Sequence, residues 1–542
     1  MPIRFSFFPV LATSLLALPV LIPGVVILSA LLFGDGEVWN HLVSTVLMKY
    51  IVNTIVLIVL VSIVSVTLGV GTAWLTSIFQ FPGSRWLPIA LVLPLAIPSY
   101  VVGYVYADLL EYSGTLQTWL RDNARIESLP AIRSLPGASL VIGFVLYPYI
   151  FMLARTNFLG QSATLGEAGR SLGLTQAKFF FRVALPLARP AVIGGLALVL
   201  METVADYGVV SHFGVPTFTT GIFRAWFAMG DVQAALQLAG CLFVIAAVLL
   251  VFEDLGRRGQ FFNPVSRDRP SAFITLTGWR SWIAVAACAI PILIGFVIPV
   301  LVLVMHAYEA GDGLGLSRLT TYAANSFQVG FLAAIFCLLA TVILSYSIRV
   351  YRLLPLRVGA RIATLGYALP GMMLAVGLLF PLGWLDRTIA TYVLENFDTN
   401  VGMIVTGSIG GLLLVYVARF TTVSYNSLNA GLLQINQRYD DAARSMGAGN
   451  FSLFRRVHFP LLKPALATGL VLVFIDVVKE LPATLILRPF NFETLATRVY
   501  RLASDERLSE ASTAALLIVA LALIPTLMLV KQSRSYWAPS GR

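Results

Sequence analysis

Apolar stretches of about twenty residues recur along the whole chain, and each is long enough to cross the roughly 30 Å hydrocarbon layer of a bilayer as a helix. We count twelve such stretches, lying approximately at 9–33, 52–79, 87–110, 137–154, 190–212, 235–253, 281–306, 326–348, 362–383, 402–420, 464–487 and 511–530. The chain has 542 residues, of which 58% are hydrophobic and only 12% charged. This composition excludes a soluble globule and predicts an all-α integral membrane protein with about twelve transmembrane helices.

The distribution of positive charge predicts the orientation of these spans. If the N-terminus is cytoplasmic, the cytoplasmic segments hold 25 of the 37 Lys and Arg residues, so both termini are expected in the cytoplasm. The first span follows Arg4 and is about twice as long as the apolar run of a secretory signal, so we interpret it as a retained anchor. Topology and anionic lipid headgroups account for the net charge of +11, and no nucleic-acid partner is expected.

The cysteines and histidines predict neither a disulfide framework nor a metal site. Cys241, Cys288 and Cys337 all fall inside predicted spans, where buried thiols are the simplest interpretation. The four histidines are scattered and have no metal-ligand spacing among them. We therefore expect no resident metal.

An internal repeat divides the chain. A shift of 274 positions superposes Glu167–Ala191 on Asp441–Ala465 with eleven identities in twenty-five positions, where chance would give about two. At a shift of 272, Tyr50 aligns with Tyr322, Asn53 with Asn325 and Pro98 with Pro370. We predict two tandem six-helix halves, 1–259 and 281–542, joined by a cytoplasmic linker at 260–280. Both copies run in the same direction, which predicts a pseudo-two-fold axis along the membrane normal with a pathway between the halves.

Each half has its longest predicted cytoplasmic segment between its fourth and fifth spans. The two segments contain the related sequences Glu167-Ala168-Gly169-Arg170-Ser171-Leu172-Gly173 and Asp441-Ala442-Ala443-Arg444-Ser445-Met446-Gly447. Each sequence predicts a short helix that ends at its last glycine, because glycine takes the left-handed conformation at little cost. A second short helix then leads to Pro186 or Pro460, so that each segment is expected to form a stiff helical elbow.

These two elbows resemble the coupling loops of binding-protein-dependent ABC importers, whose motif has Glu-Ala-Ala, then Gly, then Leu-Pro. The resemblance implies that each loop forms a coupling helix in a cleft of the ATPase subunit and transmits nucleotide-driven closure to the spans. The residues to which this role is carried over are Glu167, Ala168, Gly173, Asp441, Ala442, Ala443 and Gly447. Gly169 departs from the motif in the first copy and Asp441 in the second, but both copies keep the carboxylate. The alternative is a pair of ordinary cytoplasmic turns with i,i+3 ion pairs.

The chain contains no Gly-x-x-x-x-Gly-Lys-[Ser/Thr] motif, so we expect no bound cofactor and no catalytic residue. ATP would be hydrolysed by two copies of a separate cytoplasmic ATP-binding subunit, one for each coupling loop.

Charged residues occur inside two predicted spans that correspond in the repeat: Glu202 and Asp206 in the fifth span, and Asp476, Lys479 and Glu480 in the eleventh. Charges at membrane depth are costly and tend to face a cavity or one another. One hypothesis is that they line the translocation path and favour a hard cation, since hard metal ions prefer oxygen ligands. The other is an ion-paired lock between the halves.

The segments that follow these charges, 206–226 and 479–496, resemble those of ferric iron importer permeases, and the similarity extends over nearly the whole chain. The resemblance implies a type I ABC importer-like fold in the bacterial inner membrane, an Fe(III) substrate and a periplasmic solute-binding protein. A fused permease for thiamine or another small solute is the alternative within this class. An ion-coupled secondary transporter is the alternative outside it, and it leaves the duplicated loops unexplained.

Arg224 and Arg498, which correspond at the 274 shift, lie in predicted outer loops. We consider them possible docking residues for the binding protein. The alternative is that they are interfacial arginines that solvate helix ends.

Overall fold

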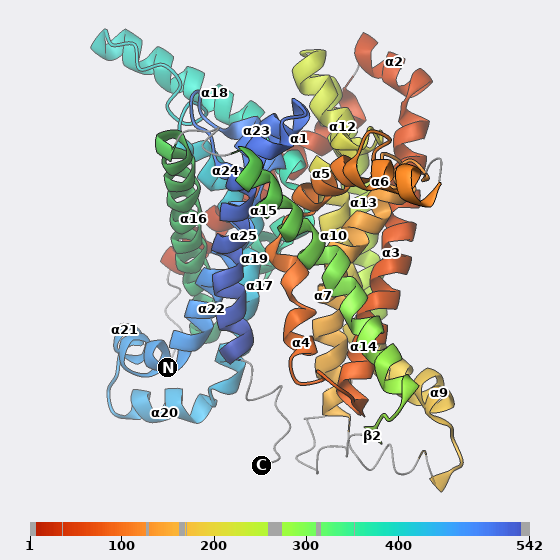
Figure 1. Cartoon of the computed structure of the whole chain (residues 1–542). Helices are drawn as coiled ribbons and strands as arrows, with labels where there is room; N and C mark the ends of the chain where they lie inside the picture. Colours follow the sequence, from red (N-terminus) through yellow and green to blue (C-terminus); the bar gives the residue numbers. More distant parts are fainter. Residues whose placement is uncertain are drawn as a thin grey trace. The chain divides into compact units, whose positions relative to one another are not determined.

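A computed structural model describes residues 7–34, 36–125, 129–161, 169, 171–257, 274–310, 316–351 and 353–532 of the chain (Figure 1). The chain folds into two compact units, and each is described by itself. Unit 1 comprises Met1–His41, Ile222–Phe243 and Leu314–Arg498. Unit 2 comprises Leu42–Gly221, Val244–Gly313 and Val499–Arg542.

Unit 1 contains α1 (Phe7–Phe33), η3 (Arg224–Ala228), α16 (Leu316–Tyr351), α17 (Leu354–Ala363), η5 (Thr364–Ala368), α18 (Gly371–Phe397), α19 (Ile409–Gln434), α20 (Gln437–Ser445), α21 (Asn450–Leu453), η6 (Phe454–His458), α22 (Phe459–Lys479) and α23 (Pro482–Leu487). Unit 2 contains α3 (Leu47–Ile78), β1 (Phe79–Gln80), α4 (Leu87–Ala90), η1 (Leu93–Ala96), α5 (Ser99–Leu110), α6 (Thr115–Ala124), α7 (Leu135–Gly160), α9 (Gln176–Phe179), η2 (Phe180–Ala184), α10 (Leu185–Ala205), α11 (Gly208–His212), β2 (Ile274–Thr275), α14 (Trp279–Ile292), η4 (Leu293–Val297), α15 (Ile298–Ala310) and α25 (Leu508–Gln532). The unit boundaries cross α2 (Glu37–Thr45), α12 (Phe218–Phe223), α13 (Val232–Arg257) and α24 (Leu495–Ser504).

The all-α integral membrane fold is confirmed, and the described helices account for nine or ten of the roughly twelve expected spans by length and composition. Within the described ranges, nine helices are long and apolar enough to cross a membrane. A tenth is added if Leu87–Ala96 and Ser99–Ala124, which are bent by 90°, form one broken span. Leu508–Ile524, within α25, is a shorter apolar helix, and α19 is not among the nine. The span predicted at 402–420 starts ahead of α19, which begins at Ile409 and continues into a polar stretch that ends at Gln434.

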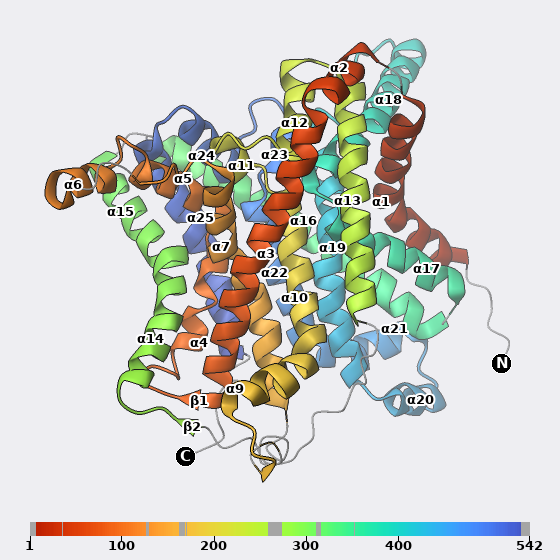
Figure 2. The same cartoon turned by 90° about the vertical axis from the view of Figure 1, so that its right-hand side faces the viewer.

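Three helices, α3, α7 and α10, form the centre of unit 2 (Figure 2). Glycines bring their backbones close together, as is common where helices pack in lipid without a hydrophobic driving force. A Cβ atom at Gly195 on α10 would lie 2.7 Å from the Cα of Ile150 on α7. A Cβ at Gly143 on α7 would lie 2.6 Å from a side-chain carbon of Val64 on α3.

The corresponding helices of the second half, α16, α19 and α22, form the centre of unit 1. A buried hydrogen bond of 2.6 Å joins the hydroxyls of Thr341 on α16 and Ser424 on α19. Repeat-related helices therefore build the same three-helix centre in both units.

The first span of each half belongs to the unit that is centred on the other half. Helix α1 packs against α17 and α18 in unit 1. The continuous stretch α14, η4 and α15 packs against α3, α5 and α25 in unit 2. Each compact unit thus combines helices from 1–259 with helices from 281–542. The division of the chain into these two halves remains a prediction from the repeat.

Candidate functional site

The second predicted coupling loop forms a helical elbow. The Asn436 side chain accepts the Arg438 N–H at 3.0 Å at the start of α20. At the other end Gly447 has φ +81°, and the Ala448 N–H donates to the Ala443 carbonyl at 3.0 Å. This bond and the left-handed glycine are a Schellman motif, which satisfies the last carbonyls of a helix. The predicted helix end at Gly447 is confirmed.

The first loop ends with the same geometry. Gly173 has φ +72°, and the Leu174 N–H donates to the Gly169 carbonyl at 3.0 Å, matching the bond of the second loop at the 274 shift. Glu167 and Ala168 lie outside the described residues. Of the predicted coupling residues in the second loop, Asp441 and Ala442 are exposed, whereas Ala443 is 5% exposed and packs inward.

Large apolar side chains stand on the surface of the second elbow. Tyr439, Met446 and Phe451 are 58%, 82% and 76% exposed. Exposed apolar groups gathered on one element are typical of a surface that another protein covers.

Asp440 anchors this elbow to two long helices, and we did not predict it. Its carboxylate accepts Nε–H of Arg349 at 2.9 Å and an Nη2–H of the same side chain at 3.0 Å. His458 Nε2 lies 2.8 Å from Oδ1 of the same carboxylate. Arg349 is on α16 and His458 directly precedes α22, so three segments of unit 1 meet at one buried carboxylate. We call Asp440, Arg349 and His458 the anchor triad.

The anchor triad also sets the ionisation of Asp440. Burial raises the pKa of its carboxyl. The hydrogen bonds from Arg349 and His458 together have a larger, opposite effect and hold the pKa below its ordinary value. In the sequence of the first half, Gly166, Ala184 and Ser77 stand at the positions that correspond to Asp440, His458 and Arg349. No sequence signal marked the triad, since its members lie 91 and 18 positions apart.

Asp206 and Glu480, both predicted for the translocation path, occupy matching helix breaks. Each directly follows a long helix, with φ and ψ of −64° and 130° at Asp206 and −69° and 121° at Glu480. Asp206 Oδ1 accepts the Val209 N–H at 3.0 Å, and Glu480 Oε1 accepts the Ala483 N–H at 3.2 Å. Each carboxylate therefore caps the short helix that follows its break, as acidic groups do at helix N-termini.

The two breaks differ in their remaining partners. Ser99 donates its hydroxyl to Asp206 Oδ2 at 2.8 Å. At Glu480 the partner is Arg419 of α19, whose Nη1 lies 2.9 Å and 3.0 Å from the two carboxylate oxygens. Gly371, the counterpart of Ser99, makes room for this arginine, because a Cβ there would lie 2.3 Å from Arg419 Nη1. We did not predict the role of Arg419, since α19 gave no charge pattern that pointed to Glu480.

The other intramembrane charges lie at partly exposed positions in their own units. In unit 1, Lys479 Nζ lies 3.7 Å from Asp476 Oδ1, and both side chains are about one fifth exposed, at 17% and 21%. In unit 2, Glu202 is half-buried on α10. Their convergence on a path, or their action as a lock, stays a prediction.

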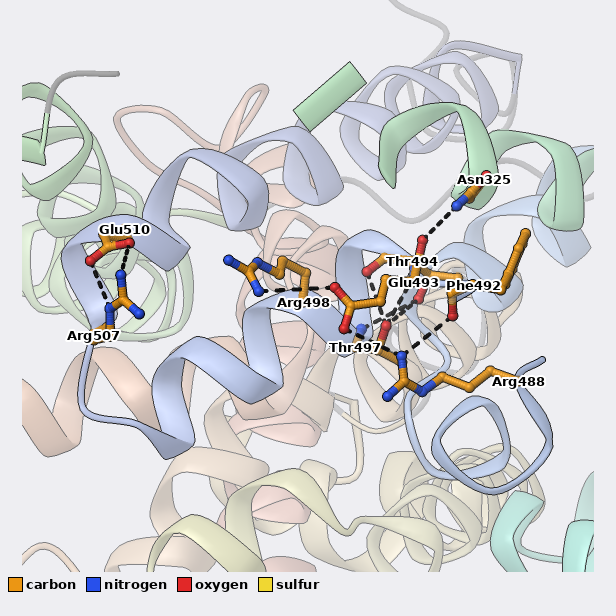
Figure 3. Close-up of polar contacts among 9 residues, drawn as sticks. All are labelled: Asn325, Arg488, Phe492, Glu493, Thr494, Thr497, Arg498, Arg507 and Glu510. Carbon is orange, nitrogen blue, oxygen red and sulfur yellow. Dashed lines mark hydrogen bonds and ion pairs between the residues drawn. The ribbon is translucent and has the colours of Figure 1, made fainter. Parts of the chain in front are cut away.

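A threonine turn recurs on the opposite side of each half from the loops. The Thr217 N–H donates to Thr220 Oγ1 at 2.9 Å, and the Thr494 N–H donates to Thr497 Oγ1 at 3.0 Å. The carbonyl before each turn accepts a side-chain N–H of an asparagine: Asn53 donates to Pro216 and Asn325 to Glu493, both at 2.9 Å. Figure 3 shows the second of these bonds. The repeat-related asparagines therefore hold equivalent turns.

This equivalence changes the register of the repeat. Thr217 matches Thr494 at a shift of 277, so the counterpart of Arg224 is Arg501 and not Arg498. Arg224 and Arg501 are both exposed. Arg498 instead has its side chain 16% exposed, 4.0 Å from Glu493, with its guanidinium 5.6 Å from the Tyr322 ring centre. Figure 3 shows Arg488 and Arg498 on either side of Glu493, and separately the 2.6 Å contact of Arg507 with Glu510. The docking roles of Arg224 and Arg498 stay predictions.

Comparison with known proteins finds similarity to permease components of binding-protein-dependent transport systems. Residues 355–536 match the family described as binding-protein-dependent transport system inner membrane component. The Fe(3+)-transport system permease protein FbpB 2 of Haemophilus influenzae is 25% identical, over 98% of this chain and 99% of that protein.

Shorter matches come from permeases that are named for other substrates. The molybdenum transport system permease protein ModB of Escherichia coli is 29% identical over 38% of this chain and 88% of its own length. The sulfate transport system permease protein CysW of the same species is 32% identical over 29% of this chain and 53% of its own length.

Proposed function

We propose that this chain, a membrane permease of the binding-protein-dependent ABC importer class, moves ferric iron from a periplasmic binding protein into the cytoplasm. The observation that carries the iron assignment is the extent of the similarity to the Haemophilus influenzae permease, which covers 98% of this chain. The sulfate and molybdenum permeases match only 29% and 38% of it.

Charge at the helix breaks supports a cationic cargo. Asp206 is held by a hydroxyl and backbone amides, with no cationic group among the donors described for it. Sulfate and molybdate are anions, which a buried carboxylate would repel, whereas a hard cation prefers carboxylate oxygen. An oxyanion permease would be expected to carry a basic or neutral group at this break.

In the proposed mechanism, the coupling loops transmit movement of the ATPase to the membrane spans. Two copies of a separate ATPase would dock on the two elbows, and the exposed Tyr439, Met446 and Phe451 supply apolar contact area on the second. Movement of α20 would reach α16 and α22 through the anchor triad, because its ion pair and hydrogen bonds join these segments directly. The spans would then alternate between outward and inward access, and this chain would bind no ATP.

Uptake into proteoliposomes that contain this chain and a candidate ATPase tests the proposal. We expect radiolabelled Fe(III), delivered by an iron-loaded periplasmic binding protein, to accumulate only when ATP is enclosed with the ATPase. Thiamine, molybdate and sulfate, each with its own binding protein, are the matched substrates. Stimulation of the ATPase by one of those proteins without iron uptake would overturn the iron assignment.

The same vesicles distinguish an ion-coupled secondary transporter. An uncoupler should leave uptake unchanged as long as ATP is maintained. Collapse of uptake under the uncoupler at constant ATP would contradict the ABC mechanism.

A further inference from the structure

Phenol groups gather around Asp206 in unit 2. Tyr100 and Tyr104 lie one turn apart on α5, with ring centres 5.8 Å apart. Tyr207 directly follows Asp206, and its hydroxyl lies 2.9 Å from that of Tyr500 on α24. Helix α5, which carries Tyr104, contacts Asp206 through the Ser99 hydroxyl at 2.8 Å and packs against α11, the short helix that Asp206 caps. We call Tyr104, Tyr207, Tyr500 and Asp206 the phenol cluster.

The Tyr104 hydroxyl is the unexplained member of this cluster. The side chain is 1% exposed, and its hydroxyl has no hydrogen-bond partner among the described residues. The ring of His212 packs on Tyr104 with a centroid distance of 4.6 Å. A buried hydroxyl without a partner costs about 1–3 kcal/mol of stability, so a phenylalanine would be expected here if only packing mattered.

The repeat provides an internal comparison. Pro98 aligns with Pro370, so the counterparts of Tyr100 and Tyr104 are Met372 and Val376. The counterpart of Tyr207 is Leu481, and in the register of the threonine turns the counterpart of Tyr500 is Phe223. Unit 1, which contains these four counterparts, thus builds the same helix break without any of these hydroxyls. The break in unit 1 forms without them, so packing alone does not explain their presence in unit 2.

We propose that the phenol cluster binds Fe(III) transiently as the cargo crosses unit 2. This inference rests on the proposed function. Carboxylate and phenolate oxygens are hard ligands of the kind that hard cations prefer. Each phenol that binds the ion gives up its proton to water, so the bound oxygen is a phenolate and offsets part of the positive charge.

His, Cys, Asp and Glu side chains alone do not form such a site. Across the described part of the chain, no three of them gather where they could hold a metal ion. The phenol cluster supplies its oxygens from tyrosines instead. Because Tyr104 and Tyr207 are 1% and 2% exposed, the ion would reach them only when this region opens during the transport cycle.

The experiment is a spectroscopic titration of the purified full-length chain in detergent with Fe(III) nitrilotriacetate. A phenolate bound to Fe(III) gives a visible charge-transfer band, which is independent of transport. We expect the band in the wild type and roughly tenfold or more weaker iron binding in Tyr104→Phe and in Tyr207→Phe, comparable to the loss of a supporting ligand group. Tyr500→Phe, at a half-buried position, serves as a further variant if either of these fails to fold.

Tyr106→Phe is the matched control. Tyr106 lies on the same helix as Tyr104, but its hydroxyl donates to the Ile294 carbonyl at 2.7 Å. Removal of this hydroxyl should therefore leave the band unchanged. Absence of the band in a wild-type chain that takes up iron in proteoliposomes would overturn the cluster and leave the proposed function intact. A band that persists in the Tyr104→Phe, Tyr207→Phe, Tyr500→Phe triple variant would also overturn it. A wild-type chain that transports another solute and not iron would instead overturn the proposed function.

Discussion

Asp440 joins three segments of unit 1 through Arg349 and His458, while its neighbour Asp441 faces outward. The side chains of Arg349, Asp440 and His458 are 12%, 8% and 0% exposed, so solvent screens their charges little. Arg349 also donates to the carbonyls of Leu432 and Ile435, which end α19. The loss of the Asp440 charge would leave the guanidinium without its ionic partner.

We expect Asp440→Asn to lower the free energy of unfolding by roughly 3 kcal/mol, as removal of one member of a buried ion pair does. Uptake per ATP hydrolysed should fall as well, since the elbow loses its connection to α16. Asp441→Asn, one position away and exposed, should change stability by no more than about 0.5 kcal/mol. Thermal unfolding in detergent, followed by fluorescence, measures both variants. Equal effects of the two substitutions would show that the triad does not anchor the loop.

The lowered pKa of Asp440 predicts a pH dependence with a definite sign. A carboxyl whose pKa is lower in the folded state stabilises the fold at pH values above its unfolded pKa, which is about 4. This stabilisation is lost as the pH falls through the folded-state pKa. The difference in unfolding free energy between wild type and Asp440→Asn should therefore be constant above pH 5 and shrink below about pH 4. A difference that grows on acidification would contradict the assignment.

Gly371 offers a test of the pair between Arg419 and Glu480. A Cβ at this position would lie 2.3 Å from Arg419 Nη1 and 2.5 Å from Glu480 Oε1, so Gly371→Ala must displace the buried pair. We expect a loss of roughly 3 kcal/mol in unfolding free energy. Gly383 on the same helix has no atom within 4 Å of an added Cβ, and Gly383→Ala should be neutral or stabilise by up to about 1 kcal/mol. Equal thermal stability of the two variants would rule out the proposed displacement.

At the scale of the element, the sequence predicted the helical elbows well because their ends depend on local chemistry. A glycine at each helix end predicted both left-handed residues, Gly173 and Gly447. The breaks at Asp206 and Glu480 were not predicted, since each lies within an apolar run that reads as one continuous span. There a carboxylate caps a new short helix, and its partners come from other helices. Such a break depends on tertiary contacts that a window of sequence does not contain.

The elbow can be tested through its backbone alone. Gly447 has φ +81° and nothing lies within 4 Å of an added Cβ, so Gly447→Val strains only the backbone, by about 1–2 kcal/mol. We expect ATP hydrolysis to continue while iron uptake falls, and a larger effect when Gly173→Val is added. Gly449 has equally open surroundings but φ −71°, so Gly449→Val is the matched control and should leave coupling unchanged. Normal uptake in the Gly173, Gly447 double variant would remove the coupling role of the loops.

At the scale of the whole molecule, the repeat predicted duplication but gave no sign of which spans pack together. Helix α1 belongs to unit 1, whose centre comes from the second half, and α14 to α15 belong to unit 2, whose centre comes from the first. The apolar surfaces of membrane helices are similar to one another and to lipid, so hydropathy carries little information about packing partners. Particular residues decide instead, such as Gly377 of α18, where an added Cβ would lie 2.8 Å from Pro23 of α1.

This arrangement predicts how a divided chain would behave. If residues 1–259 and 281–542 are produced separately, each half lacks helices that its compact unit requires. We expect each fragment alone to be degraded in cells, and co-expression of both fragments to restore their levels and iron uptake. Immunoblotting of membranes measures the levels. A stable fragment of either half on its own would contradict the interdependence of the halves.

The placement of α1 also has a consequence in time. Helices α16 to α18, against which α1 packs, begin only at Leu316, so α1 enters the membrane long before its partners are translated. At ~5–20 residues per second, the ribosome needs roughly 15 to 60 s to bridge that interval. Throughout the delay α1 is surrounded by lipid on the side that the partners later cover. The helix is apolar enough to remain in lipid by itself during this delay, so its apolar sequence serves synthesis as well as the finished fold.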